Sequence, residues 1–158
     1  MGIKKCDNIS NLDIINVLKS FKNFRGVFPI DLLPSKIKNN ECGVINLDVS
    51  TGSGLHWVCY YNDPKLDFVE YFDPFGEYKL VKRKHKIIPT EIVKYLKSGV
   101  KNKIMYNDAF LQQIDSSKCG CFVIKYITLR QQGYSPKDTL NKFTEYPRNY
   151  NEKFVLKF

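Results

Sequence analysis

Apolar and polar positions along this chain alternate in short blocks, which predicts several brief helices and strands. Residues 10–21 have an imperfect amphipathic spacing, typical of a helix, with Ser10 as its cap and Asp13 in its first turn. Gly26 and Pro29 then interrupt the pattern, and the segment after them is expected to form a loop or a single turn.

Three strands are predicted in close succession after this interruption. Residues 43–49 alternate between apolar and polar types, whereas residues 55–61 and 68–72 are rich in aromatic residues and valine. Asn62-Asp63-Pro64 is a turn signal, so the second and third strands are expected to form a hairpin.

The second half of the chain is mainly helical in its pattern. A helix is expected over residues 89–97, and a short strand over residues 103–106. Residues 119–132 are the most apolar helical segment, with Gly133 as its stop, and such a helix is expected to lie buried against a sheet. A further short helix is expected over residues 136–143. Together these elements predict an α+β domain with a mainly antiparallel sheet packed against helices.

Length and composition are typical of one globular domain. The chain has 158 residues, 43% of them hydrophobic, and no linker or repeat divides it, so residues 1–158 are expected to form a single domain. No apolar run approaches the roughly 18 residues of a membrane span. The N-terminal residues also lack the apolar core of a secretory signal. We therefore expect a soluble intracellular protein that is a monomer and contacts no membrane.

The charge of the chain raises the question of an acidic partner. Lys and Arg number 25 against 16 Asp and Glu, a formal net charge of +9. This surplus favours nucleic acid, an anionic membrane surface or an acidic protein as a partner. An A/T-rich genome would produce the same abundance of lysine without selection for any partner. Four residues of one basic loop are candidates for DNA contacts or a nuclear signal, with a solvated loop as the alternative: Lys82, Arg83, Lys84 and Lys86.

The cysteines point to chemistry more than to disulfides. Their number is odd at five and their spacing is irregular, which argues against a disulfide framework and favours a reducing compartment. No CxxC pair occurs, so no metal site is expected. Cys119 would begin the apolar helix, where the helix dipole and free backbone N–H groups favour a thiolate nucleophile. The alternative for Cys119 is a small buried hydrophobe, and Cys121, about 200° around the helix, is expected to pack in the core.

A cysteine nucleophile needs a base, and the chain offers two histidines. His56 begins an apolar strand, whereas His85 lies in the basic loop, where an imidazolium would be repelled. Across the predicted hairpin Asp73 lies beside His56, so its carboxylate is placed to orient the imidazole. Glu70 is expected to face the other side of the sheet. Taken alone, His56 is equally compatible with a structural role at a strand end, and Asp73 with an Asx-type turn.

Three short motifs surround these residues in a defined order. They are Gly54-Leu55-His56-Trp57, then Tyr71-Phe72-Asp73-Pro74-Phe75-Gly76, then Gln112-Gln113-Ile114-Asp115-Ser116-Ser117-Lys118-Cys119-Gly120. Together they resemble the adenovirus maturation protease family, the adenains, and the wider Ulp/SENP group of cysteine proteases. The resemblance extends over about residues 43–133, and the spacing between His56 and Asp73 fits the adenain pattern.

The resemblance implies a catalytic role for each matching residue. Cys119 would be the nucleophile, His56 the general base and acid, and Asp73 the residue that orients His56. Gln113 would donate its side-chain N–H to an oxyanion hole, beside the backbone N–H of Cys119. Gln112 is the alternative donor, because the spacing before the cysteine varies by one residue within the group.

Two further residues are candidates for substrate contact. Trp57 would shield the catalytic pair and contact substrate, with a core aromatic as its alternative. Gly120 has no side chain, so it would allow the backbone of a substrate to approach closely.

Within the group, this sequence is most similar to proteases of virophages and Polinton-type elements. That similarity implies an endopeptidase that cleaves capsid or other virion precursor proteins, in the virion and in the cytoplasmic virus factory or nucleus of a host cell. The chemistry would require no cofactor, but the family implies activation by DNA or by a peptide bound through a cysteine such as Cys6, Cys42 or Cys59. Three alternatives are an isopeptidase that removes a ubiquitin-like modifier, an acyltransferase on the same fold, and a basic DNA-binding protein without enzymatic activity.

Overall fold

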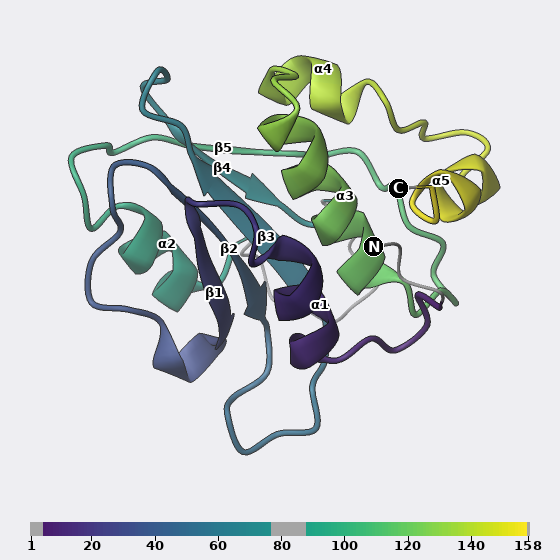
Figure 1. Ribbon diagram of the computed structural model, residues 1–158, viewed down its shortest axis with the longest axis horizontal. Helices are drawn as coiled ribbons and strands as arrows, with labels where there is room; N and C mark the ends of the chain where they lie inside the picture. The colour runs from purple at the N-terminus through teal and green to yellow at the C-terminus, as the bar shows by residue number, and fades with distance from the viewer. Residues whose placement is uncertain (1–4, 77–87, 158) are drawn as a thin grey trace.

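A computed structural model describes residues 5–76 and 88–157, which are built around a five-stranded sheet (Figure 1). The strands lie in the order of the sequence and are β1 (Phe24–Pro29), β2 (Glu41–Asn46), β3 (Trp57–Asn62), β4 (Val69–Phe72) and β5 (Ile104–Tyr106). The described helices are α1 (Asn11–Leu18), the 3-10 helix η1 (Ile30–Leu32), α2 (Thr90–Leu96), α3 (Cys119–Gln131), α4 (Pro136–Leu140) and α5 (Asn149–Phe154).

The sheet is mixed in direction. Strands β2, β3 and β4 pair antiparallel, whereas β1 pairs parallel with β2, and β5 parallel with β4. Parallel neighbours require a crossover connection, which η1 and its loop provide on one side and the segment containing α2 provides on the other. The predicted α+β class is therefore confirmed, while the antiparallel arrangement expected of the sheet applies to its three central strands.

Helices cover both faces of the sheet, with α1 and α3 on one face and α2 on the other (Figure 1). Side chains along β3 alternate between the two cores. Val58 and Tyr60 pack toward α2, whereas Cys59 and Tyr61 pack toward α3. Each fully buried apolar side chain contributes about 1.5–3 kcal/mol relative to exposure, so the two cores hold the central strands in one register.

The predicted helices and strands occur close to their expected positions. α1 begins at a capping box, in which Ser10 Oγ accepts the Asp13 N–H and the Asp13 carboxylate accepts the Ser10 N–H. Strand β1 and helix α5 were not predicted. Gly26 and Pro29 suggested a break, but Gly26 lies at an irregularity in the register and Pro29 at the end of an edge strand, where a missing N–H is tolerated. The α5 segment is short and polar, without apolar periodicity.

A disulfide between Cys6 and Cys121 ties the segment before α1 to α3. This bond corrects the expectation that the cysteines form no disulfides; it joins residues 115 positions apart, so spacing in the sequence does not indicate it. Cys42 and Cys59 are free but buried, and burial raises the pKa of the Cys42 thiol to about 12. None of the three cysteines considered for a peptide activator therefore presents an accessible thiol.

No helix within residues 5–76 and 88–157 has both the length and the hydropathy needed to cross a membrane. The same residues contain no group of three or more His, Cys, Asp or Glu arranged to hold a metal ion. The basic residues considered for nucleic-acid binding lie outside the described residues, as does His85: Lys82, Arg83, Lys84 and Lys86.

Candidate active site

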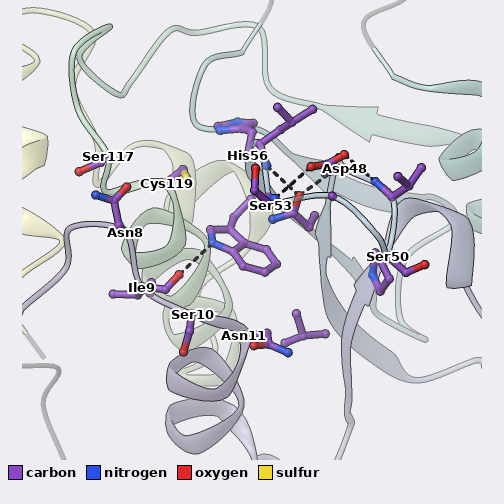
Figure 2. A pocket seen from close by; sticks show the side chains of 18 of the residues that line it. Asn8, Ile9, Ser10, Asn11, Asp48, Ser50, Ser53, His56, Ser117 and Cys119 are labelled. Atoms are coloured by element: carbon purple, nitrogen blue, oxygen red, sulfur yellow. Dashed lines mark hydrogen bonds between the residues drawn. The ribbon is translucent and has the colours of Figure 1, made fainter.

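A cavity of about 740 Å³ lies where the segment before α1, the loop before β3 and the start of α3 meet (Figure 2). Residues from all three sequence motifs line it: His56, Trp57, Phe75, Gln112 and Cys119. The folding of the chain therefore gathers motifs from distant parts of the sequence into one cavity.

The imidazole of His56 is held by Asp73. His56 Nε2 lies 2.7 Å from Asp73 Oδ1, and both residues are buried. The register of β3 and β4 explains the contact, because the start of β3 lies opposite the end of β4. Phe75 stacks on the imidazole with ring centroids 4.7 Å apart, and its N–H donates to the same carboxylate oxygen. Glu70 points away, as expected, and binds Arg130 of α3.

Asn107 holds the backbone of Asp73 from the neighbouring strand. Asn107 Oδ1 accepts the Asp73 N–H at 3.0 Å, and Asn107 Nδ2 donates to the Asp73 carbonyl at 2.7 Å. Asn107 follows β5, which pairs with β4, so its buried amide continues the pairing of these strands beyond their ends. Asn107 was assigned no role from the sequence; its position directly after the predicted strand at residues 103–106 was the available signal.

The electrostatics of His56 are set by its neighbours. Burial of the ring acts to lower its pKa. The charge of Asp73, the hydrogen bond to Asp73 and a hydrogen bond with Cys119 outweigh this effect and raise the pKa of His56 to about 9. The ring is therefore protonated at neutral pH, beside the sulfur of Cys119.

This raised pKa links the stability of the protein to pH. A pKa of about 9 in the folded state, against 6.5 for free histidine, means that the folded protein holds the proton more tightly than the unfolded chain. The stabilisation is complete below pH 6.5. Between pH 6.5 and 9 the free energy of unfolding is expected to fall by roughly 3 kcal/mol as pH rises. Urea unfolding at a series of pH values, without reductant, measures this fall. If the free energy of unfolding of His56→Asn falls by the same amount over this pH range, the fall does not come from the His56 ring.

Cys119 is the first residue of α3. Backbone N–H groups in the first turn of a helix have no partner within the helix, so the Cys119 N–H is available to an oxygen atom placed in the cavity. The Cys119 side chain is partly exposed and lines the cavity together with His56 (Figure 2). A thiol and an imidazole thus line one cavity at the N-terminus of a helix.

The structure places Gln112, rather than the expected Gln113, in this cavity. Gln112 is fully buried, and its Nε2 donates to the Ser116 carbonyl at 2.7 Å. Gln113 does not line the cavity, and its backbone N–H donates to Glu152. The backbone N–H of Gln112 donates to the carbonyl of Pro74, which follows Asp73, and this long-range contact holds Gln112 at the cavity.

Of the two residues expected to contact substrate, Trp57 lines the cavity and Gly120 does not. Trp57 lines the cavity, and its Nε1–H donates to the Ile9 carbonyl at 3.3 Å (Figure 2). Gly120 is buried, and a Cβ there would lie 2.5 Å from Ile9 Cγ1. The missing side chain of Gly120 thus makes room for Ile9, which corrects the expectation that it makes room for substrate.

The loop before His56 forms another wall of the cavity, and its own side chains hold it. Asn46 Oδ1 accepts the N–H groups of Asp48 and Leu55, and Asp48 Oδ2 accepts the N–H of Gly54 (Figure 2). Sequence reasoning missed these residues, because a polar side chain in a loop has many partners to choose from. Their bonds give the cavity wall a defined shape.

Comparison with known proteins agrees with this geometry. A family model described as the Ulp1 protease family, C-terminal catalytic domain, matches residues 33–154. A search of curated proteins finds no match.

Solved structures of a viral protease share the fold. A crystal structure of the pS273R protease of African swine fever virus (ASFV) matches with a TM-score of 0.65 and 15% identity, covering 96% of this chain and 67% of the other. Its selenomethionine form matches with a TM-score of 0.62 and 16% identity, covering 96% and 68%. The SUMO protease Ulp1, with its catalytic cysteine oxidized to a sulfinic acid, matches with a TM-score of 0.47 and 16% identity, covering 93% and 76%.

Proposed function

We propose that this chain, which belongs to the Ulp1 protease family, is a cysteine endopeptidase that cleaves virion precursor proteins with Cys119, His56 and Asp73. Family membership makes it a cysteine protease domain, so its substrate is a polypeptide. The observation that carries the residue assignment is the buried 2.7 Å contact between His56 and Asp73 in the cavity where Cys119 begins α3.

The first half of the proposed reaction forms a thioester. The Cys119 thiolate attacks the carbonyl carbon of the scissile bond, and the carbonyl oxygen becomes a tetrahedral oxyanion. His56 then donates its proton to the leaving amine as the C–N bond breaks. A raised pKa suits this step, because the ring must carry a proton at neutral pH. Asp73 keeps the imidazolium oriented and offsets its charge.

The oxyanion would be stabilised by two donors. One is the backbone N–H of Cys119, and the other is the side chain of Gln112. An amide nitrogen carries two N–H groups, and Gln112 Nε2 uses one for the Ser116 carbonyl, its only acceptor among the described residues. The second N–H is available to the oxyanion.

The second half of the reaction releases the acyl group. His56, now neutral, takes a proton from water, and the hydroxide attacks the thioester carbonyl. The C–S bond breaks, the acid product leaves, and the thiolate and imidazolium are restored. No step requires a metal or another cofactor. Activation by DNA or by a peptide remains our proposal from family resemblance, and so does a location in the virion and in the virus factory or nucleus of a host cell.

The viral assignment is supported by the fold. This chain aligns over 96% of its length with the ASFV pS273R protease at a TM-score of 0.65. The sequence motifs favour the virophage and Polinton-type proteases within the family. Membership of a protease family leaves the non-enzymatic DNA-binding alternative without support.

A panel of substrates tests the proposed function. We expect the wild-type protein to cleave linear peptide bonds in a library of proteome-derived peptides, read by mass spectrometry, and in candidate capsid precursors. The ratio of kcat/KM for linear substrates to that for SUMO or ubiquitin joined by an isopeptide bond is expected to exceed about tenfold. The reverse ratio would indicate an isopeptidase. Transfer of an acetyl group from acetyl-CoA, without cleavage, would indicate an acyltransferase.

A further inference from the structure

We infer that Glu152, on α5, is a positioning residue that holds residues 112–118, here named the oxyanion loop, in the conformation that catalysis requires. The inference rests on the proposed function, because it assigns Glu152 a role through Gln112. Glu152 lies outside the three motifs, near the C-terminal end of the chain and well beyond Cys119.

The carboxylate of Glu152 binds the oxyanion loop at two points. Glu152 Oε1 accepts the backbone N–H of Gln113 at 2.9 Å, and Oε2 accepts the Ser116 hydroxyl at 2.7 Å. The Ser116 hydroxyl in turn accepts the N–H of Lys118, the residue before the nucleophile. Hydrogen bonds to an ionised carboxylate are stronger than those between neutral groups, so this is a firm anchor.

The anchor acts on the oxyanion donor through Ser116. The Ser116 carbonyl accepts Gln112 Nε2 at 2.7 Å and so orients the amide. The backbone N–H of Ser116 also donates to the Gln113 carbonyl, which closes a turn across the loop. Without Glu152, the hydroxyl of Ser116 and the N–H of Gln113 lose their partner, and Ser116 no longer has a defined place from which to orient Gln112.

The burial of Glu152 supports a specific role. Only 8% of its surface is exposed, and a buried carboxylate is costly unless it is hydrogen-bonded. An apolar residue could fill this position in α5 without that cost. Among the described residues, the side-chain hydrogen bonds and the ion pair of Glu152 all go to the oxyanion loop. Lys118 Nζ, 3.8 Å from Oε2, offsets part of the charge.

Kinetics and alkylation together test this role. In Glu152→Ala we expect kcat to fall by about 10- to 100-fold, with KM little changed. This decrease should not exceed the decrease in kcat that follows removal of the oxyanion donor itself. The rate of Cys119 alkylation by iodoacetamide is expected to stay at the wild-type value, because alkylation uses the thiolate but no oxyanion hole. Glu152→Gln, which keeps an acceptor for Gln113, should recover much of kcat. Lys153→Ala, an exposed neighbour on the same helix, is the matched control and should behave as wild type.

A double-mutant cycle identifies the route of the effect. In a Gln112→Ala background, Glu152→Ala should cost little more, because the donor that it positions is already absent. Equal losses in both backgrounds, or a parallel loss of alkylation, would overturn the inference. If Gln112→Ala loses kcat but Glu152→Ala does not, the role of Glu152 is overturned and the role of Gln112 as oxyanion donor stands. If Gln112→Ala keeps the wild-type kcat, the proposed oxyanion donor is overturned as well.

Hydrogen exchange provides a readout that needs no substrate. The Gln113 N–H is bonded to Glu152, so its exchange is expected to accelerate in Glu152→Ala and to stay unchanged in Lys153→Ala. Unchanged exchange in Glu152→Ala would show that the carboxylate does not hold the loop.

Discussion

Replacement of Cys119 by alanine is expected to reduce peptide-bond hydrolysis by a factor on the order of 10⁶, as removal of the nucleophile does in other triad proteases. Without the sulfur no thioester can form. The cavity itself loses only one sulfur atom, so substrate binding should be retained. Product formation over hours, followed by mass spectrometry under single-turnover conditions, measures the loss.

Cys42→Ala is the matched control for this prediction. Cys42 is also a free cysteine, but it is buried in β2, and its thiol has a pKa raised to about 12. We expect Cys42→Ala to be less stable yet to cleave at close to the wild-type kcat. Cleavage by Cys119→Ala at a rate comparable to wild type would place the nucleophile elsewhere and remove the basis of the proposed mechanism.

Asp73→Asn is expected to lower kcat by about 10³- to 10⁴-fold while leaving the fold intact. Asparagine has nearly the shape of aspartate, and its amide oxygen can still accept the N–H of Phe75. It lacks the charge that stabilises the imidazolium of His56, and its NH₂ group can favour the wrong tautomer. The pKa of His56 should therefore fall, and the decrease in unfolding free energy between pH 6.5 and 9 should become smaller.

A second aspartate of the same hairpin serves as the control. Asp67 lies in the connection between β3 and β4 and is exposed, paired with Lys103 at the surface. Asp67→Asn removes the same charge at a site remote from His56, and kcat should stay near the wild-type value. Equal activity in Asp73→Asn and Asp67→Asn would show that Asp73 does not orient His56.

Local sequence patterns were sufficient for the elements closest to the proposed chemistry. The turn at residues 62–64 sets the pairing of β3 with β4, and this pairing alone brings His56 to Asp73. The apolar run that begins at Cys119 gives α3, with Cys119 at its N-terminus. These predictions succeeded because each depends on neighbours in the chain: a turn, a strand period of two, or the start of a helix.

Residues whose partners are far away in the chain could not be assigned in this way. The spacing before Cys119 allowed either Gln112 or Gln113 to be the oxyanion donor. Gln113 was favoured, but it does not line the cavity. The contact of the Gln112 N–H with the Pro74 carbonyl decides the choice, and it joins two motifs that are separate in the sequence. The Cys6–Cys121 disulfide and strand β1 were missed for the same reason, since each requires a partner that only the folded chain supplies.

By itself, the sequence determined the α+β class and the protease family, because these are carried by short contiguous motifs and by hydrophobic periodicity. Only the tertiary structure decided which glutamine lines the cavity, that Ile9 fills the space over Gly120, and that Glu152 binds the loop before Cys119. The physical reason is that a loop has no repeating hydrogen-bond pattern of its own. Its conformation is determined by the buried groups that satisfy its N–H and C=O groups, and these come from distant parts of the chain.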